Sequence, residues 1–348
     1  MNTAVVKENR KVKVVMKYKN IWTILGMTCF LLFLVQGVSA QDEQIEKVGQ
    51  TGFQFLKIDV AARPAAMAGA TTMGSMGADA MFYNPAGLSE MGVSGDFFAS
   101  RVSWFADMNL NAGALAKDFG NWGVLGVNFV SIDYGKLIGT RVADNEQGYV
   151  ETGDLDVGAY AVGVSYARAL TNKFKVGGQV KFTSQRLGSN LMPDGETVKN
   201  EVSTLAYDFG TIFYPGWQSF RFGMSVRNFS PQIRYEENTF ELPLTFRIGA
   251  AMSMFDLIGG LSNQSLLFEV DALHPRDYSE RLHLGAEYWY SDLIALRAGY
   301  KFNYDEEGLN LGFGINYGVA GVKLKFDYAY SSFGLFNNVN RITIGGSF

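Results

Sequence analysis

The chain has 348 residues, of which 40 are glycine, 14% are aromatic and 18% are charged, and its mean hydropathy is close to zero at +0.02. This length accommodates one large β domain or two smaller domains. Membrane-spanning helices would raise the mean hydropathy well above zero, so the composition does not fit a helical membrane protein. It suits strands in which apolar and polar residues alternate.

The first 40 residues have the features of a signal peptide for Sec export. Six basic residues lie between 7 and 19, an apolar run follows at 21–35, and the segment ends in Val38-Ser39-Ala40. An N-terminal membrane anchor is the alternative, but the apolar run is shorter than the ~20 residues of a spanning helix. We therefore predict a signal peptide at 1–40, cleaved before Gln41.

Cleavage there would change the charge and the cysteine content. It would remove six basic residues and Glu8, so the net charge would go from −4 to −9, and it would remove Cys29, the only cysteine. The mature chain would then have no disulfide and no cysteine metal ligand. Its acidic charge argues against a nucleic-acid partner. After residue 40 no apolar stretch approaches 18 residues, which leaves a soluble periplasmic protein or a membrane β-barrel.

Residues 41–92 do not alternate and are rich in Ala, Gly and Met. A short helix is predicted at Asp79–Tyr83, and Asn84-Pro85 ends it because proline lacks a backbone donor and restricts the residue before it. A segment this small and apolar before a barrel is expected to pack inside the lumen, and we call it the hatch segment. A disordered periplasmic leader is the alternative.

From residue 93 to the end, apolar and polar residues alternate in segments of ten to fifteen residues. In 281–290, for example, Leu282, Leu284 and Tyr288 share one face, and Arg281 and Glu287 share the other. We predict about fourteen antiparallel strands, near 95–106, 108–118, 121–134, 155–170, 174–187, 200–214, 218–229, 241–253, 264–274, 279–290, 292–303, 307–318, 321–332 and 338–348.

The connections between these segments alternate between tight turns and long polar loops, the latter at 135–154, 188–199 and 230–240. This pattern is typical of all-β transmembrane barrels of the bacterial outer membrane. A soluble β-sandwich would also alternate, but aromatic residues near strand ends favour lipid-facing strands with interfacial girdles. The final strand ends at Phe348, which resembles the terminal aromatic signal for barrel insertion.

Charged residues are expected to face the lumen on these strands. The alternation points ten basic residues inward, of which seven define a lumen basic face, namely Arg221, Arg227, Arg247, Arg281, Arg297, Lys323 and Lys325. Five acidic residues share this parity, whereas the hatch segment carries six acids and three bases. The basic excess either complements an acidic hatch segment or holds a carboxylate ligand.

The hatch segment also carries recognisable motifs. The run Gly52–Ile58, then Ala62-Arg63, Ala66–Ala70, Asp79-Ala80 and Asn84–Leu88 resembles the PorV/PorQ family, relatives of the FadL-type fatty-acid transporters. The resemblance implies a fourteen-stranded barrel with an N-terminal hatch. It also implies a hatch motif formed by Arg63, Asp79, Asn84, Pro85, Ala86 and Gly87. Some members of that family serve type IX secretion and escort cargo to surface-attachment machinery.

Catalytic chemistry is not predicted. The two histidines, His274 and His283, lack a nucleophile nearby, and the acidic run Asp305–Glu307 is expected to be a solvated loop rather than a metal site. An outer-membrane phospholipase would need a lipid-facing Ser–His pair, and no serine can be placed beside His274. We therefore expect no enzyme activity, cofactor or metal.

The sequence thus predicts an outer-membrane protein of a Gram-negative bacterium with three parts, a signal peptide (1–40), a hatch (41–92) and a barrel (93–348). Type IX secretion or surface attachment of cargo is the leading function. Expected partners are outer-membrane lipid and lipopolysaccharide, and secretion-system proteins or secreted cargo. A FadL-like uptake channel for long-chain fatty acids or other hydrophobic solutes is the alternative, with a hydrophobic carboxylate as its ligand.

Overall fold

The computed structural model describes residues 49–348 apart from 75, 192–195, 236 and 260–261. The predicted signal peptide and its cleavage site lie outside the described residues. The described residues belong to one compact unit, and the architecture below is that of this unit. Among the described residues, no helix is long and apolar enough to cross a bilayer.

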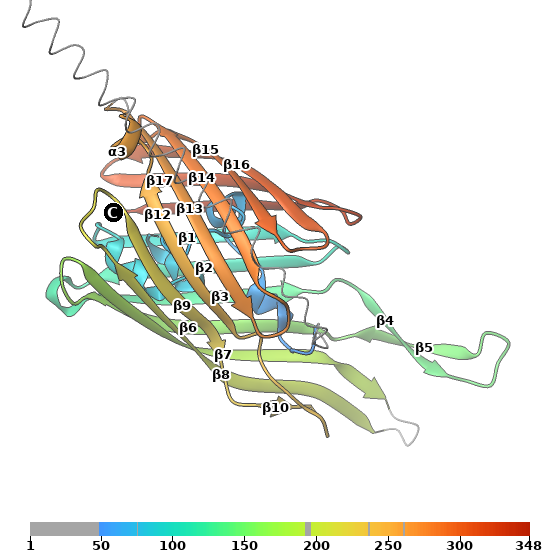
Figure 1. Cartoon of the computed structure of the whole chain (residues 1–348). Coiled ribbons are helices and arrows are strands. Elements are labelled where there is room, and N and C mark those ends of the chain that lie inside the picture. Colours follow the sequence, from blue (N-terminus) through green and yellow to red (C-terminus); the bar gives the residue numbers. More distant parts are fainter. Residues whose placement is uncertain (1–48, 75, 192–195, 236, 260–261) are drawn as a thin grey trace, which may run out of the picture. The chain divides into compact units, whose positions relative to one another are not determined.

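Fourteen antiparallel strands close into one barrel in which neighbours in the sequence are neighbours in the sheet, and the first strand pairs with the last (Figure 1). Each of the fourteen predicted strands is present. Their bounds are β1 (Gly95–Ser103), β2 (Asn109–Asp118), β3 (Val124–Asp133), β6 (Gly158–Ala169), β7 (Phe174–Leu191), β8 (Thr197–Phe213), β9 (Arg221–Phe229), β12 (Thr245–Ser253), β13 (Gln264–Pro275), β14 (Arg281–Tyr290), β15 (Ile294–Phe302), β16 (Glu307–Val319), β17 (Val322–Phe333) and β18 (Val339–Ser347).

The connections at one end of the barrel are short. Val319 pairs with Val322, so Ala320 and Gly321 alone make the turn, with φ angles of 51° and 82° as in a type I′ hairpin. Two short helices, η4 (Gly120–Trp122) and α3 (Phe255–Ile258), lie in other connections at this end. Since short turns face the periplasm in outer-membrane barrels, we call this the inner end and the opposite one the outer end.

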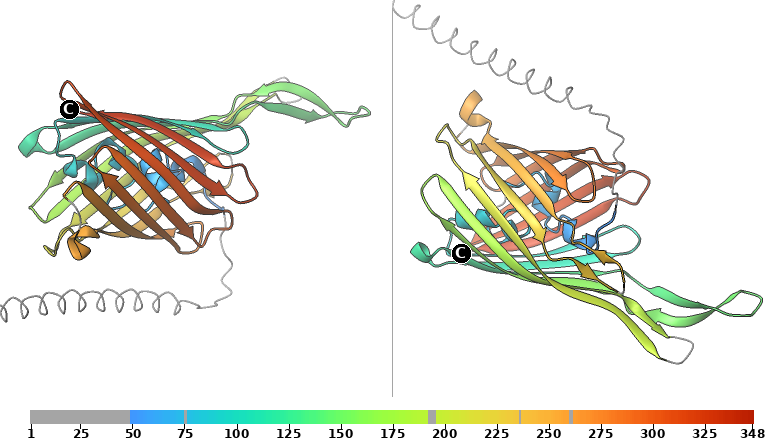
Figure 2. Two further views of the ribbon diagram at one scale, coloured as in Figure 1. Left: turned by 90° about the horizontal axis from the view of Figure 1, so that it is seen from above. Right: turned by 60° about the horizontal axis from the view of Figure 1, so that its bottom comes forward.

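The outer end carries the long connections, and here two predictions were wrong. Residues 135–154, predicted as a loop, form most of a hairpin of β4 (Leu137–Val142) and β5 (Tyr149–Leu155). Most of 188–199 lies in β7 and β8, which have 18 and 17 residues. Nearly all of the hairpin's residues are exposed, so no buried face imposes the alternation that reveals a strand. Figure 2 shows the hairpin and the ends of β7 and β8 projecting beyond the barrel.

A second, two-stranded sheet of β10 (Ile233–Arg234) and β11 (Thr239–Phe240) lies in the connection between β9 and β12.

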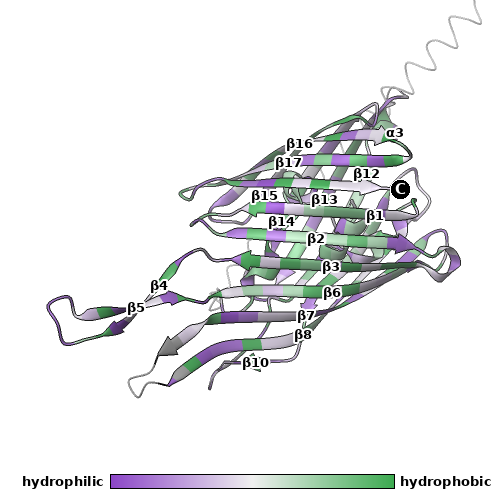
Figure 3. Ribbon diagram, turned by 180° about the vertical axis from the view of Figure 1, so that it is seen from behind, coloured by the Kyte–Doolittle hydropathy of each residue, from purple (hydrophilic) through white to green (hydrophobic). Residues whose placement is uncertain are grey.

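Along the barrel itself the predicted alternation is present. Leu296, Leu311 and Ile344 are exposed on the outside, whereas Arg297, Asn310 and Thr343 beside them are buried in the lumen. In Figure 3 apolar colouring recurs along the barrel strands, while hydrophilic colouring recurs on β4 and β5.

The described part of the hatch segment, residues 49–92, lies in the lumen (Figure 1). It starts at the outer end, where Thr51 bridges to Glu241, and finishes at the inner end, where β1 begins. It contains η1 (Gln54–Lys57), α2 (Ala62–Ala66), η2 (Ala78–Phe82) and η3 (Pro85–Glu90). The predicted short helix at Asp79–Tyr83 corresponds to η2, which is a 3₁₀ helix. The buried apolar side chains of the hatch segment pack against the inner faces of the strands.

Candidate functional site in the barrel lumen

Glycines on the inner face of the wall let the hatch segment approach the strands closely. A Cβ atom at Gly210 of β8 would overlap Asn84 Oδ1, and one at Gly177 of β7 would overlap the backbone of Pro85. Gly299 of β15 stands in the same relation to the backbone of Met67. Any larger residue at these positions would displace the hatch segment, so the wall and the hatch segment are shaped to fit each other.

Asn84 and Pro85 fix the turn between η2 and η3. The Asn84 side chain is fully buried; its Nδ2 donates to Thr72 O at 2.8 Å and to Thr211 O of β8 at 3.2 Å, and its Oδ1 accepts from Ala86 N. Asn84 is the N-cap of η3, and Pro85 occupies the first position, where a missing N–H costs nothing. One side chain therefore joins two parts of the hatch segment to the wall.

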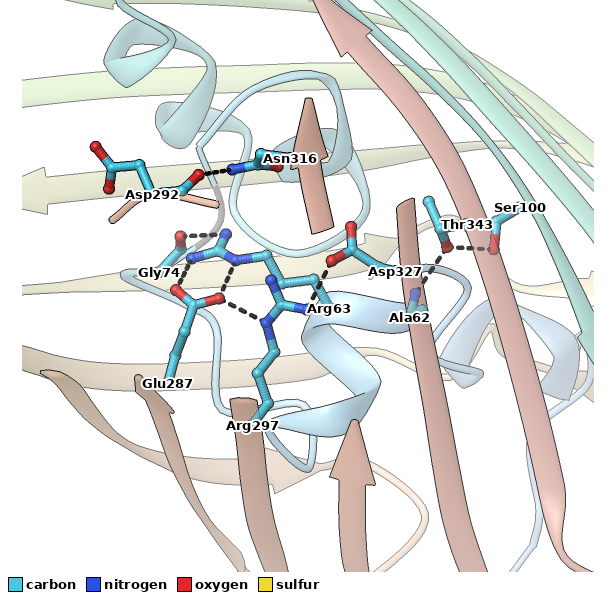
Figure 4. Close-up of polar contacts among 10 residues, drawn as sticks. All are labelled: Ala62, Arg63, Gly74, Ser100, Glu287, Asp292, Arg297, Asn316, Asp327 and Thr343. Carbon is cyan, nitrogen blue, oxygen red and sulfur yellow. Dashed lines mark hydrogen bonds and ion pairs between the residues drawn. The ribbon is translucent and has the colours of Figure 1, made fainter. Parts of the chain in front are cut away.

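Arg63 of α2 is held by a buried ion network (Figure 4). Its Nε and Nη2 both donate to Glu287 of β14 at 2.8 Å, and its Nη1 donates to Gly74 O. Arg297 of β15 donates to Glu287 at 2.6 Å and to Asp327 of β17 at 2.6 Å. Every guanidinium here has a carboxylate partner, which offsets the cost of taking charge out of water.

Two neighbouring carboxylates of β13 accept backbone N–H groups of the hatch segment. Asp271 Oδ2 accepts from the N–H groups of Thr71 and Thr72, and Glu269 Oε1 accepts from those of Met73 and Gly74. These four donors belong to a segment without regular structure. Among the described residues, Thr71 N also donates to Gly69 O at 3.0 Å, and the other three N–H groups have no backbone acceptor. The wall therefore provides the hydrogen bonds that the 71–74 segment lacks.

Arginines of the wall bind hatch carbonyl oxygens in the converse way. The pairs, from strands β9, β12 and β18, are Arg221–Met73 O at 3.0 Å, Arg227–Leu56 O at 3.1 Å, Arg247–Gly69 O at 3.1 Å and Arg341–Asp59 O at 2.7 Å. Among the described residues, none of these four arginines has a carboxylate within ion-pair distance. Their positive charge is thus not neutralised by direct pairing.

Three of these arginines also line a cavity of about 400 Å³ at the outer end, which we call the outer cavity. Its other wall is apolar and includes Trp104, Phe105 and Phe333, whose rings pack at 5.0–6.0 Å between centroids. Arg281 enters from β14 and lies between the rings of Tyr278 and Tyr304, at 4.1 and 3.8 Å. A basic wall therefore faces an aromatic one.

Some polar atoms of the outer cavity are left without a partner. The Nε atoms of Arg227, Arg247 and Arg281 and the Nδ1 of His283 are buried and make no hydrogen bond within the described structure. His283 uses its other nitrogen, Nε2, on Tyr304 Oη at 2.8 Å. The three arginine Nε–H groups are donors, and buried donors normally have partners, so this arrangement suits an anionic group.

Two acids of the hatch segment, Asp59 and Asp79, have opposite electrostatic surroundings. Burial alone would raise the pKa of Asp59, but Lys301 at 3.1 Å, with Arg247 and Arg341, holds it well below its usual value. Burial raises the pKa of Asp79 to about 6, although Arg63 opposes the rise. Asp79 has no hydrogen bond or ion pair in the described part of the chain.

The predicted site residues separate into two groups in the structure. Arg221, Arg227, Arg247 and Arg281 point towards the hatch segment or the outer cavity, whereas Arg297, Lys323 and Lys325 lie towards the inner end. Of the hatch motif, Arg63 and Asp79 lie at the inner end, and Asn84, Pro85, Ala86 and Gly87 form one turn against β7 and β8.

Sequence reasoning missed several residues of the lumen. Lys301, which pairs with Asp59, was left out although its parity matches that of Arg297. Asp96, which accepts from Lys325 and from Ala78 N, lies at the very start of β1, where no alternation precedes it. The aromatic wall at Trp104 and Phe105 belongs to a connection, which periodicity does not describe.

A family model described as "Type IX secretion system membrane protein PorP/SprF" matches residues 127–344. The chain belongs to this family. The match begins after the hatch segment and covers most of the barrel, so it rests on residues other than those that resemble PorV/PorQ. No curated protein matches the chain.

Solved structures with the same fold are barrels of the outer membrane. The chain is 15% identical to the "CymD monoaromatic hydrocarbon channel", with a TM-score of 0.54 over 83% of this chain and 97% of that one. A Pseudomonas aeruginosa FadL homologue (11%, TM-score 0.50, 83% and 98%) and the Pseudomonas putida toluene transporter TodX (12%, 0.50, 77% and 92%) are also similar. The protein is therefore an outer-membrane barrel with a FadL-like fold.

Proposed function

We propose that this protein is a non-catalytic component of type IX secretion that binds a secreted cargo or a partner protein at the outer end. The single observation that carries this is the projecting surface formed by β4, β5 and the ends of β7 and β8, above a lumen filled by the hatch segment. A filled lumen favours action through the ends of the barrel. The PorP/SprF family provides the secretion context.

The projecting surface has the character of a protein-binding face. Ile138 is 52% exposed and Val142 is 89% exposed on one face of β4, and Tyr149, which pairs with Val142, is exposed beside them. Arg186 of β7 pairs with Asp156 at 2.9 Å at the base of the hairpin. Exposed apolar groups on a rigid support are typical of interaction sites.

The hatch segment, residues 41–92, is in this proposal a seal of the PorV/PorQ type, with Asn84 and Pro85 as its main attachment. The apolar outer surface of the barrel lies in outer-membrane lipid, and the outer rim contacts lipopolysaccharide. Sec export after cleavage near Ala40 would deliver the protein there.

The proposal is tested with Ile138→Asp combined with Val142→Asp in the bacterium that makes the protein. Cargo on the cell surface should fall about tenfold, which corresponds to ~1.4 kcal/mol of lost binding energy. Arg141→Ala, on the opposite face of β4, is the control and should leave cargo display unchanged. Normal display with the double variant, at normal barrel abundance, would refute docking at this surface.

A FadL-like role is a second candidate, and the outer cavity favours it. Guanidinium groups without carboxylate partners face an aromatic wall, an arrangement that suits a hydrophobic carboxylate. The proteins named as hydrocarbon channels and toluene transporter show that this fold accommodates such chemistry in other chains.

Binding of radiolabelled palmitate to the purified barrel tests this second role. Arg281→Gln removes a cation that has no hydrogen bond to the hatch segment, and it should weaken binding about 10- to 100-fold, the equivalent of ~1.5–3 kcal/mol. Arg101→Gln on the outside of β1 is the control and should have no effect. If the parent protein binds no palmitate, or if both variants bind equally, the outer cavity is not a carboxylate site.

A further inference from the structure

A second cavity, of about 280 Å³, lies at the inner end, and we call it the inner vestibule. Its floor is hatch segment, including Ala61, Arg63 and Asp79, and its walls are the inner ends of strands from β14 round to β1. Asp292 and Lys323 at its rim are exposed to solvent. The inner vestibule is thus accessible from the periplasmic side and closed towards the lumen.

Most charges of the inner vestibule are neutralised in pairs. Arg63 and Arg297 share Glu287, and Arg297 also pairs with Asp327. Lys325 pairs with Asp96 at 2.5 Å. These groups already have partners and gain little from a ligand.

Three charged side chains that line the inner vestibule have no ion-pair partner among the described residues, and two of them are acidic. Asp79 lies half-buried on the floor, while Asp292 and Lys323 are exposed at the rim. A half-buried carboxylate without a hydrogen bond is unfavourable and gains most from a cation that reaches it. The ring of Trp289, half-buried on the wall, adds a face that packs against an aliphatic stem.

We propose that the inner vestibule binds a lysine or arginine side chain of a periplasmic protein, with Asp79 as its counter-ion. A long basic side chain combines the two properties of the cavity, because its stem lies along Trp289 and its cation reaches Asp79. A bare metal ion fits less well, since the described residues contain no group of three or more metal ligands. The closed floor makes this a docking site and not an entrance to a channel.

This site is separate from the projecting surface at the outer end, so the two proposals succeed or fail independently. Together they would join a periplasmic partner to the inner end and a secreted protein to the outer end of one rigid barrel. The proposed binding groups of the two ends differ accordingly: exposed apolar side chains of the hairpin at the outer end, and the carboxylate of Asp79 at the inner end.

Protection of an introduced thiol tests the proposal on the detergent-solubilised barrel. Met76 lines the inner vestibule and is 37% exposed, so Met76→Cys in a Cys29→Ser background reports access to the cavity. The probe is acetyl-Gly-Lys-Gly-amide, and the readout is the rate of thiol modification by N-ethylmaleimide. The lysine peptide should halve that rate at about 1–10 mM, the affinity of one desolvated ion pair with modest packing. The same peptide with norleucine in place of lysine, which lacks the charge, should not slow the reaction.

Variants of Asp79 decide the role of the carboxylate. Asp79→Asn should abolish protection by the lysine peptide, and Asp79→Glu should retain it. Met108→Cys in the outer cavity should not be protected by either peptide. The proposal is overturned if the lysine peptide gives no protection at about 10 mM, if the norleucine peptide protects equally, or if protection survives Asp79→Asn.

Discussion

The two ends of the lumen hold arginines in different ways. At the outer cavity, Arg227, Arg247 and Arg341 donate to carbonyl oxygens of the hatch segment and have no carboxylate partner among the described residues. At the inner vestibule, Arg63 and Arg297 are both bound to Glu287. A carbonyl positions a guanidinium without neutralising it, whereas a carboxylate does both. The outer end therefore keeps positive charge available for an anion. At the inner end the arginines are neutralised by Glu287, and this ion network holds the hatch segment against the wall.

The largest expected effect comes from breaking the inner network. Glu287→Gln leaves the buried Arg297 and the half-buried Arg63 without their shared carboxylate and should lower the free energy of unfolding by ~3–5 kcal/mol. Arg247→Gln at the outer cavity should cost only about 1 kcal/mol, because losing one hydrogen bond is partly offset by removing an unpaired charge. Urea unfolding in lipid vesicles measures both. Equal losses would show that the two ends do not differ in this way.

The comparison also depends on which face of the wall is inside. Leu284 lies on the outer face of β14, in its central part, and Leu284→Arg should destabilise the barrel by ~2–4 kcal/mol. Tyr290→Arg on the same face, beside the short turn at the interface, should cost ~0–1 kcal/mol. Refolding into bilayers gives the two values, and similar costs would mean that the register or the depth of β14 is wrong.

A smaller effect should appear in the pH dependence of the two hatch acids. The pKa of Asp79 is raised to about 6 from 3.8, so its contribution to stability is lost as the pH rises from about 4 to 6. The pKa of Asp59 is lowered, so its contribution is present above pH 3.8 and is lost as the pH falls below that value. The melting temperature of Asp79→Asn should vary less with pH than that of the parent between about pH 4 and 6. The melting temperature of Asp59→Asn should vary less with pH below 3.8. No change in either interval would contradict the assigned surroundings.

The sequence predicted the barrel well because each strand has a lipid face and a lumen face. On β14, Leu284 is at an even position and Glu287 at an odd one, and this alternation alone places Leu284 on the lipid face and Glu287 on the lumen face. The β4–β5 hairpin was not predicted, because both of its faces are exposed and its residues show no alternation. The charge balance left open whether the basic wall complements the hatch segment or holds a carboxylate ligand, and it did not indicate the form of the contacts. Most wall arginines bind backbone carbonyls, and partners such as Asp59 and Lys301 are 242 residues apart. Pairing over such separations depends on three-dimensional packing, which a charge count does not contain.

The most direct test of the sealed lumen is the single-channel conductance of the purified protein in a planar bilayer. Gly210→Leu, whose side chain would occupy the position of Asn84, should release the hatch segment and raise the conductance well above that of the parent. Gly178→Leu on the outer face of neighbouring β7, where a Cβ meets nothing closer than 3.7 Å, should conduct as little as the parent. Asn84→Ala combined with Pro85→Ala should behave like Gly210→Leu. A parent protein that already conducts like an open pore, or a Gly210→Leu variant that inserts normally and stays closed, would contradict the account.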